Sequence, residues 1–453
     1  PDPDAEPPVT AELAAFLVEA EVDDRLRARA VDCLVDTAGA IVHGSTQPWS
    51  EAVIAHVDAT GADGPCTVVG GRSTAPALAA LANGSSAHAF ELDDVHEEAI
   101  SHPGAVVVPA AIAVGEQLDV SGPALLEAIV VGYEAMGRAG IAVGPAAHML
   151  AGFHPTSMSG VFGAAAAAGR LLDFDAATLN NAFGIAVSLA SGTMEFAASG
   201  GMAKRLHAGR AAEGGVTAAL LAARGFEGAT DGLAGRYGFC RVFGPEPRPE
   251  RLTGELGERW MIDEITVKPW AACSDIHPLI QAAAELRADG LDVRRIARIE
   301  ARAPTKAARQ NSLDGTMSVM AAQYSAQWNV AAALVADPTD PATYHADRIA
   351  DPAIAALQDV VVSVETDAAF DATYAWRMGG ALRVELDDGS VLERTVHGQR
   401  GSMHDPLSGR EVDAKFLALA GDRVAIDALT CLRGAAERRV RAIGRALVGG
   451  DRG

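Results

Sequence analysis

Paired cysteines, a surplus of basic residues and long apolar runs are all missing from this chain of 453 residues. Its five cysteines are widely spaced and form no CxxC pair. This argues against a disulfide framework or a structural zinc site, and it predicts a reduced, cytoplasmic protein. No apolar run approaches the roughly 18 residues of a membrane-spanning helix. We therefore expect no membrane partner.

The chain has 37 basic residues against 59 acidic ones, which gives a formal net charge of -22. A nucleic-acid-binding surface needs clustered Lys and Arg, so we expect no nucleic-acid partner. A small anionic substrate remains compatible, because a pocket responds to its own few residues rather than to the net charge. GxGxxG, GxxxxGK[ST] and GxSxG motifs are also absent, which weighs against dinucleotide, P-loop and esterase chemistry.

Apolar residues recur at helical spacing through the first half of the chain. The segment 23–43 includes Leu34, Ala38 and Ile41 at steps of four and three, which predicts an amphipathic helix. Similar stretches occupy about 74–88, 105–118, 122–141, 157–172, 176–192 and 207–224. After about residue 265, residues 297–302 alternate between apolar and charged, and Asp388-Gly389 predicts the turn of a hairpin over 382–396. Helix returns over 413–448, so the predicted order is helical, mixed α+β, helical.

The densest group of functional side chains lies in residues 91–104. This acidic cluster includes Asp93, Asp94, His96 and His102. Such a group can carry acid–base chemistry or bind a divalent metal. A solvated acidic loop between two helices is the plain alternative. No HExxH or comparable ligand spacing supports the metal interpretation.

Two further motifs precede expected helices: GFHPTS at 152–157 and GGMAKRLHAGR at 200–210. His154 stands just before a helix, whose N-terminal N–H groups can hold a carboxylate. Glycines beside Lys204, Arg205 and His207 suit close approach to an anionic ligand. A capping turn and a basic surface loop are the respective alternatives without function.

A fourth motif, KPWAACSDIH at 268–277, lies at the junction with the mixed region. Lys268 and His277 would be able to close over a substrate bound there. An ordinary linker would look similar, and Cys273 is interpreted as a small core residue.

These motifs, in this order and spacing, resemble the MmgE/PrpD superfamily, which includes 2-methylcitrate dehydratases, cis-aconitate decarboxylases and iminodisuccinate epimerases. The segments that carry the resemblance are HAFELDDVHEEAISHPG, GFHPTSMSGVFGAAAAAGRLL, GGMAKRLHAGRAAEGG, KPWAACSDIHPLI and GSMHDPLSGREVDAKF. The resemblance covers about residues 10–445. It implies a mainly α fold, with a large all-helical domain from residues 10–265 and 405–450 and a smaller α+β lid domain over 266–404. Residues 1–9 are expected to form a flexible tail. A homodimer without metal or organic cofactor is also implied.

Carried over residue by residue, the resemblance implies one pocket fed by all four motifs. The expected catalytic residues are Asp93, His102, His154, Lys204 and His277. The expected substrate-binding residues are Asp94, Arg205, His207 and Lys268. The lysines and protonated histidines would hold substrate carboxylates, while one histidine moves a proton at carbon. The same cations would stabilise an enolate-like transition state.

Such a pocket serves water elimination, decarboxylation and epimerisation alike. We expect a cofactor-independent lyase, in the first place a hydro-lyase, acting on a small polycarboxylate such as a 2-methylcitrate-like acid. A decarboxylase of the cis-aconitate type and an epimerase are alternatives. Val95 stands where the decarboxylases have a threonine, and Trp328 where they have an aromatic hydroxyl, which an indole cannot replace as a proton donor. A non-catalytic carboxylate-binding protein and a metallohydrolase built on the acidic cluster are the alternatives from other classes.

Overall fold

The computed structural model describes residues 8–199, 201–313, 318–421 and 426–449. Of the expected N-terminal tail, residues 1–7 lie outside the described residues, and Val9 already begins a helix. Helices dominate and strands are few, which confirms the mainly α fold class. The chain forms two compact units: unit 1 is Pro1–Ile265 with Gly409–Gly453, and unit 2 is Thr266–Ser408. A lid role for unit 2 stays a prediction.

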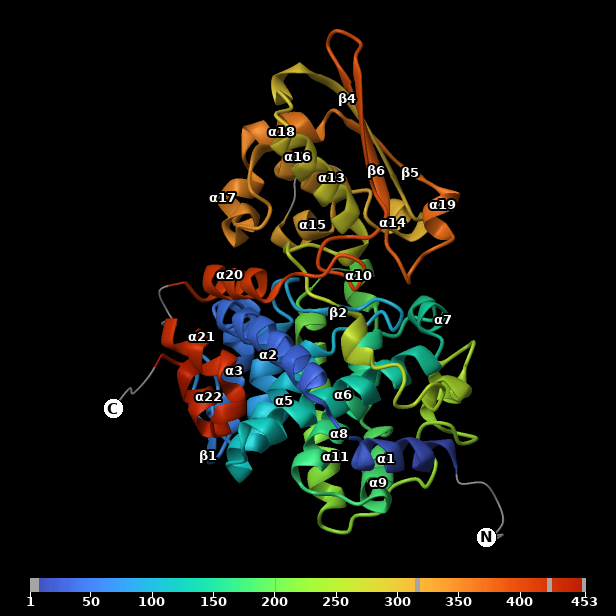
Figure 1. The fold of residues 1–453 in the computed structure, drawn as a ribbon, viewed down its shortest axis with the longest axis vertical. Helices are drawn as coiled ribbons and strands as arrows, with labels where there is room; N and C mark the ends of the chain where they lie inside the picture. The colour runs from blue at the N-terminus through green and yellow to red at the C-terminus, as the bar shows by residue number, and fades with distance from the viewer. Residues whose placement is uncertain (1–7, 200, 314–317, 422–425, 450–453) are drawn as a thin grey trace. The chain divides into compact units, whose positions relative to one another are not determined.

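Unit 1 is helical (Figure 1). Its N-terminal segment contains α1 (Val9–Glu19), α2 (Asp24–Gly44), α3 (Pro48–Thr60), β1 (Asp63–Cys66), α4 (Pro76–Ala87), β2 (Val95–His96), α5 (Gly104–Leu118), α6 (Gly122–Ala142), α7 (Pro145–Leu150), α8 (Pro155–Leu171), α9 (Ala176–Ala186), α10 (Glu195–Ser199), α11 (Ala203–Ala222) and α12 (Phe239–Phe243). Its C-terminal segment adds α20 (Gly409–Ala420), α21 (Ile426–Arg433) and α22 (Val440–Leu447). Of the stretch 413–448 expected to be helical, residues 413–420, 426–433 and 440–447 are helical, and residues 422–425 lie outside the described residues.

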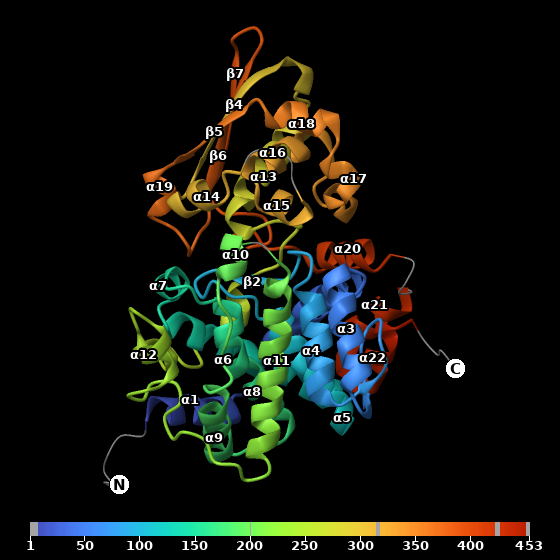
Figure 2. The same ribbon diagram turned by 180° about the vertical axis from the view of Figure 1, so that it is seen from behind.

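The core of unit 1 is built around α8, which is buried along almost its whole length. Its small residues, including the run Ala164–Ala168, let α5, α6 and α11 pack closely against it. Helix α11 also packs along α4 (Figure 2). Helices α20 and α21 pack on α2, and α22 packs on α5, so both ends of the chain contribute to one core. This packing brings the C-terminus of α4 together with the N-termini of α5, α8 and α11.

Unit 2 combines a four-stranded sheet with helices, most of which lie on one side of it (Figures 1 and 2). Its elements are β3 (Ile265–Thr266, at the boundary), α13 (His277–Ala288), β4 (Ile296–Ala303), α14 (Thr305–Gln310), α15 (Val319–Tyr324), α16 (Ala326–Val335), α17 (Ala346–Ile349), α18 (Pro352–Gln358), β5 (Val361–Thr366), α19 (Ala368–Asp371), β6 (Gly380–Leu386) and β7 (Val391–Val396). The strand order is β5-β4-β6-β7, with β4 and β5 parallel and the other pairs antiparallel. The predicted hairpin is confirmed, and Gly389 takes φ 80° in its turn. Among the described residues, no helix has the length and apolarity that a membrane crossing requires.

Gly209 sets how closely α11 approaches α4. A Cβ atom at this position would lie 2.2 Å from the Leu81 carbonyl oxygen and 2.9 Å from the Ser85 backbone nitrogen. Gly214, on the same helix, would bring its Cβ no closer than 3.4 Å to any neighbour, which is ordinary contact.

We expect Gly209→Ala to lower the free energy of unfolding by about 1–3 kcal/mol or more, because the two helix backbones must separate. Gly214→Ala is the matched control and should be neutral or stabilising by up to about 1 kcal/mol, since Ala favours helix over Gly. Urea unfolding of both variants checks this. Equal stabilities for the two variants would contradict the close α4–α11 contact.

Glu116 on α5 is a buried residue that contacts Thr67 and the C-terminal helix α22. It accepts hydrogen bonds from the Thr67 backbone N–H at 2.7 Å and from the Thr67 hydroxyl at 2.6 Å. Gly444 on α22 packs against it so closely that a Cβ there would overlap the Glu116 carboxylate. Burial raises the pKa of Glu116 to about 7, against a smaller lowering by its bonds to Thr67.

A raised carboxyl pKa means that the protonated form stabilises the fold. That contribution is fully present below the unfolded pKa of about 4.3 and is lost as the pH rises through about 7. We expect Glu116→Gln to flatten the fall of Tm between about pH 5 and 8, because Gln never ionises. Its amide oxygen can accept from the Thr67 N–H while its NH₂ group donates to the Thr67 hydroxyl oxygen. Thermal unfolding across this range tests it. A Tm profile parallel to that of the wild type would show that Glu116 does not titrate there.

Candidate active site

The acidic cluster is buried, so the solvated-loop interpretation is wrong. His88 caps the C-terminus of α4, and the chain then runs through Glu91, Asp93 and Asp94 before His102 and the start of α5. Asp93 and Asp94 have no exposed surface, and Glu91 is 2 % exposed. Buried carboxylates need close hydrogen-bond or charged partners. The neighbours of these side chains therefore define the site.

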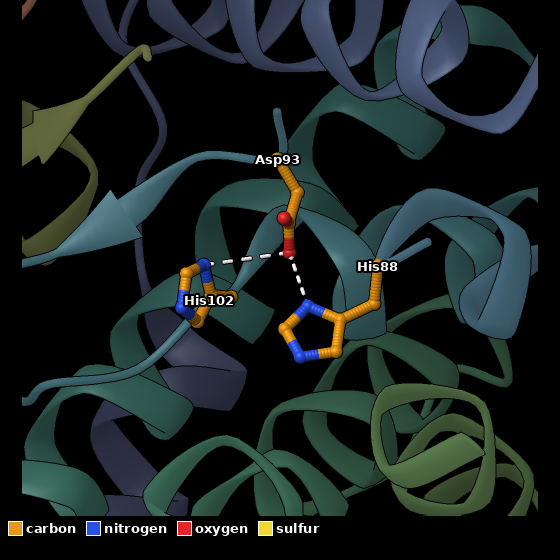
Figure 3. A group of neighbouring side chains, drawn as sticks. All are labelled: His88, Asp93 and His102. Atoms are coloured by element: carbon orange, nitrogen blue, oxygen red, sulfur yellow. Dashed lines mark hydrogen bonds and ion pairs between the residues drawn. The ribbon is translucent and has the colours of Figure 1, made fainter. Parts of the chain in front are cut away.

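Asp93 is shared by two histidines (Figure 3). Its Oδ2 lies 2.6 Å from Nδ1 of His88 and 3.4 Å from Nδ1 of His102. The ring of His88 is fully buried and lies 4.9 Å from that of His102, centroid to centroid. Sequence reasoning missed His88, which stands at the end of an apolar helix and resembles a core histidine. Its signal was the carboxylate of Asp93 five residues later.

Asp94 holds the loop in place. Its Oδ1 accepts from the Gly104 backbone N–H at 2.8 Å, and its Oδ2 accepts from the Tyr133 hydroxyl at 2.6 Å. Burial raises the pKa of Asp94 to about 7, while the bond from Tyr133 lowers it by a smaller amount. Both oxygens have protein partners and no exposed surface, which favours a supporting role for Asp94, while its expected substrate-binding role stays a prediction.

The backbone of the same residue fixes the tautomer of His102. Nδ1 of His102 donates to the Asp94 carbonyl oxygen at 2.8 Å. In a neutral imidazole, a protonated Nδ1 leaves a lone pair on Nε2. The side chain of His102 keeps 12 % exposure, unlike the fully buried His88. His102 is therefore prepared to accept a proton at Nε2.

Lys204 and Arg205, at the start of α11, share one buried anion. Both donate to Oε1 of Glu91, and their exposures are 4 % and 3 %. The Arg205 guanidinium also lies 5.7 Å from the centre of the Trp49 ring. Glu91 thus offsets part of the positive charge of both cations. Glu91 was within the quoted motif, but its partnership with residues more than 100 positions away gives no local signal.

His154 and His207 meet ring to ring. Their Nδ1 atoms lie 3.0 Å apart, and the His154 ring is 5.8 Å from that of His88, centroid to centroid. Burial lowers the pKa of His154 well below its ordinary value, and nearby His88 and Lys204 add to this. Burial also lowers the pKa of His207 to about 4. The lowered pKa values favour the neutral form of both rings while no substrate carboxylate is bound, and the expected role of protonated histidines stays a prediction.

Lys268 and His277 belong to unit 2. Lys268 is 1 % exposed and His277 is fully buried at the start of α13. Nε2 of His277 donates to the Ala272 carbonyl oxygen at 3.2 Å, and its ring lies 5.1 Å from that of Trp270, centroid to centroid. Their expected roles stay predictions. The structure brings Asp93, Asp94, His102, His154, Lys204, Arg205 and His207 together within unit 1.

One group in this site has the composition of a metal centre. His88, Asp93 and His102 each offer a ligand atom, and these atoms lie within 4.8 Å of one another. The Asp93 oxygen, however, faces both imidazole Nδ1 atoms at hydrogen-bonding or near-contact distance, and Nδ1 of His102 already donates to a carbonyl. The three side chains therefore pair with protein groups through the same atoms that a metal ion would need. His96, which the metallohydrolase alternative used, instead lies 3.5 Å from the Glu264 carboxylate.

Known proteins resemble this chain along most of its length. Cis-aconitate decarboxylase of Aspergillus terreus is 29% identical over 447 residues, which cover 93% of this chain and 91% of that protein. A cis-aconitate decarboxylase-like protein of Aspergillus oryzae is 31% identical over 445 residues, 91% of this chain and 90% of that protein. Human cis-aconitate decarboxylase is 29% identical over 375 residues, 79% of this chain and 75% of that protein.

The family comparison agrees with the order of the motifs. The MmgE/PrpD N-terminal domain matches residues 11–252, and the MmgE/PrpD C-terminal domain matches residues 270–434. Together with the relatives, this supports an enzyme of the lyase kind. The two matched domains span most of the sequence, and the chain belongs to the MmgE/PrpD family.

Proposed function

We propose that this protein is a lyase that acts without cofactor on a small polycarboxylate by moving a proton at a carbon next to a carboxylate. The observation that carries the proposal is His102, whose Nδ1 is held by the Asp94 carbonyl beside the buried Asp93. This leaves Nε2 to exchange a proton with substrate. The cation pair of Lys204 and Arg205 supplies positive charge for a carboxylate and for a developing enolate.

The first candidate reaction is decarboxylation of a cis-aconitate-like acid, which is favoured by the names of the relatives. In this reaction the C–C bond to one carboxylate breaks and CO₂ leaves. The electron pair of the broken C–C bond is delocalised into a remaining carboxylate, where the cations stabilise the negative charge. A histidine then returns a proton to carbon.

The second candidate is addition or removal of water, the hydro-lyase reaction expected from the sequence. The resemblance favours it, because Trp328 on α16 is expected to stand where the decarboxylases have an aromatic hydroxyl. Here His102 takes a proton from carbon, and the hydroxyl group leaves with a proton from a second acid. Epimerisation would use the same proton transfer and return the proton to the other face.

Proton NMR in D₂O, with the enzyme dialysed against EDTA, tests the proposal. We expect turnover or deuterium exchange at one carbon of cis-aconitate, citrate, 2-methylcitrate or an iminodisuccinate-type acid. Loss of CO₂, gain or loss of water, and exchange alone identify decarboxylase, hydro-lyase and epimerase chemistry respectively. Activity that disappears with EDTA and returns with a divalent metal would contradict the cofactor-free mechanism. A folded protein that leaves every compound unchanged would contradict the substrate class.

Substitutions separate the roles of the two parts of the site. We expect His102→Gln to lower kcat by about 100-fold or more, because general acid–base catalysis contributes on that scale. Lys204→Met should raise KM and lower kcat together, since it removes charge from bound substrate and transition state alike.

His56→Gln is the control, because His56 is exposed on α3 outside the site. Steady-state kinetics on the active compound, with circular dichroism for folding, measure these effects. A folded His102→Gln variant with the wild-type kcat would show that His102 is not a catalytic residue.

A further inference from the structure

We infer that His154 and His207 share one proton along their Nδ1···Nδ1 contact and act as a single acid–base unit, in which His207 is the positioning residue that sets the tautomer of His154. The catalytic part of this inference rests on the proposed function. The structural part does not, because it follows from the two rings alone.

The geometry of the pair restricts its protonation. The two Nδ1 atoms lie 3.0 Å apart and the ring centroids 5.1 Å apart. A hydrogen bond at this distance needs a proton on one Nδ1 and a lone pair on the other. Two imidazolium rings would direct two N–H groups at each other. The pair therefore carries at most one positive charge.

The surroundings hold the rings in this relation. The His154 backbone N–H donates to the Gly192 carbonyl oxygen, and His154 is the N-cap residue of α8. Phe196 packs its ring edge to face with both imidazoles, at 5.5 Å from His154 and 5.6 Å from His207. The Ser157 hydroxyl bonds the Ser191 carbonyl oxygen, which fixes the segment before Gly192. Both rings are thereby confined.

Sharing one proton makes the two Nε2 atoms opposite in character. The ring that donates through Nδ1 has a lone pair on Nε2, while the ring that accepts carries a proton on Nε2. The neutral pair thus offers one base and one acid at the same time. Burial and the nearby Lys204 and His88 keep the pair uncharged, since they lower both pKa values.

A proton can cross the pair with every atom balanced. The first Nε2 takes up the proton that His102 has removed from substrate carbon, and that ring becomes an imidazolium. It passes its Nδ1 proton to the second ring, which then gives its own Nε2 proton to the departing hydroxyl group. The pair ends neutral with the two tautomers exchanged. His207 is therefore required for turnover even where it does not bind the substrate.

Nitrogen NMR of ¹⁵N-histidine-labelled protein tests the pair without any substrate. Near neutral pH, we expect one protonated Nδ1 and one Nδ1 lone pair, joined by a nitrogen–nitrogen coupling across the hydrogen bond. His148 is an internal reference, because its Nδ1 donates to the Phe243 carbonyl oxygen at 2.8 Å and has no nitrogen partner there. The coupling should vanish in His207→Phe. Its absence from the wild type, or two protonated Nδ1 atoms, would overturn the inference.

Kinetics on the compound found active then test the positioning role. We expect His207→Phe to lower kcat by about 100-fold while KM changes by less than about threefold. His207→Asn should keep KM but stay well below the wild-type kcat, because its amide can hold the tautomer of His154 but cannot pass a proton on. A raised KM with unchanged kcat would make His207 a substrate ligand and overturn the role. If the coupling is seen but no compound reacts, the proposed function fails and the proton-sharing pair stands.

Discussion

The candidate site depends on keeping the Asp94 carboxylate buried and fully hydrogen-bonded. A buried charge or polar group without partners is costly, and Asp94 meets this requirement with the Gly104 N–H and the Tyr133 hydroxyl. These bonds tie the loop after α4 to the first turn of α5 and to α6. The carbonyl of the same residue accepts from His102. One residue thus fixes both the path of the loop and the tautomer of a histidine, so a change that released it would displace Asp93 and His102 together.

The carboxylate of Glu91 competes with a substrate carboxylate for Lys204 and Arg205. Glu91 lies between Lys204 and Arg205, and buried ion pairs of this kind persist only where close contacts offset desolvation. A substrate carboxylate must share these cations with Glu91 or take its place. A second or third carboxylate on the same molecule supplies further contacts that offset this competition. We therefore expect the site to favour a polycarboxylate over a simple monoacid.

The sequence predicted the helices and the β6–β7 hairpin because periodicity and turn residues are local signals. The motifs also predicted Asp93, His154 and Lys204 as neighbours, through the resemblance. His88 and Glu91 were missed, since each acquires its significance only when the fold buries it against a partner. The lowered pKa values of His154 and His207 had no local signal either, because sequence does not reveal that two rings will face each other at Nδ1 and lose their solvation.

Proton transfer alone does not select among the reactions of this family, so the selection must come from the surroundings of the departing group. Unit 1 offers two different environments. Lys204 and Arg205 form a cationic end, whereas Phe196 sets an apolar edge against the neutral rings of His154 and His207. A carboxylate beside Phe196 would be poorly solvated, and loss of CO₂ relieves that cost while the remaining carboxylates stay with the cations. A departing hydroxyl at the same place needs an acid, which the proton on one Nε2 of the histidine pair provides. We therefore expect the orientation of a substrate between these two ends to decide the reaction.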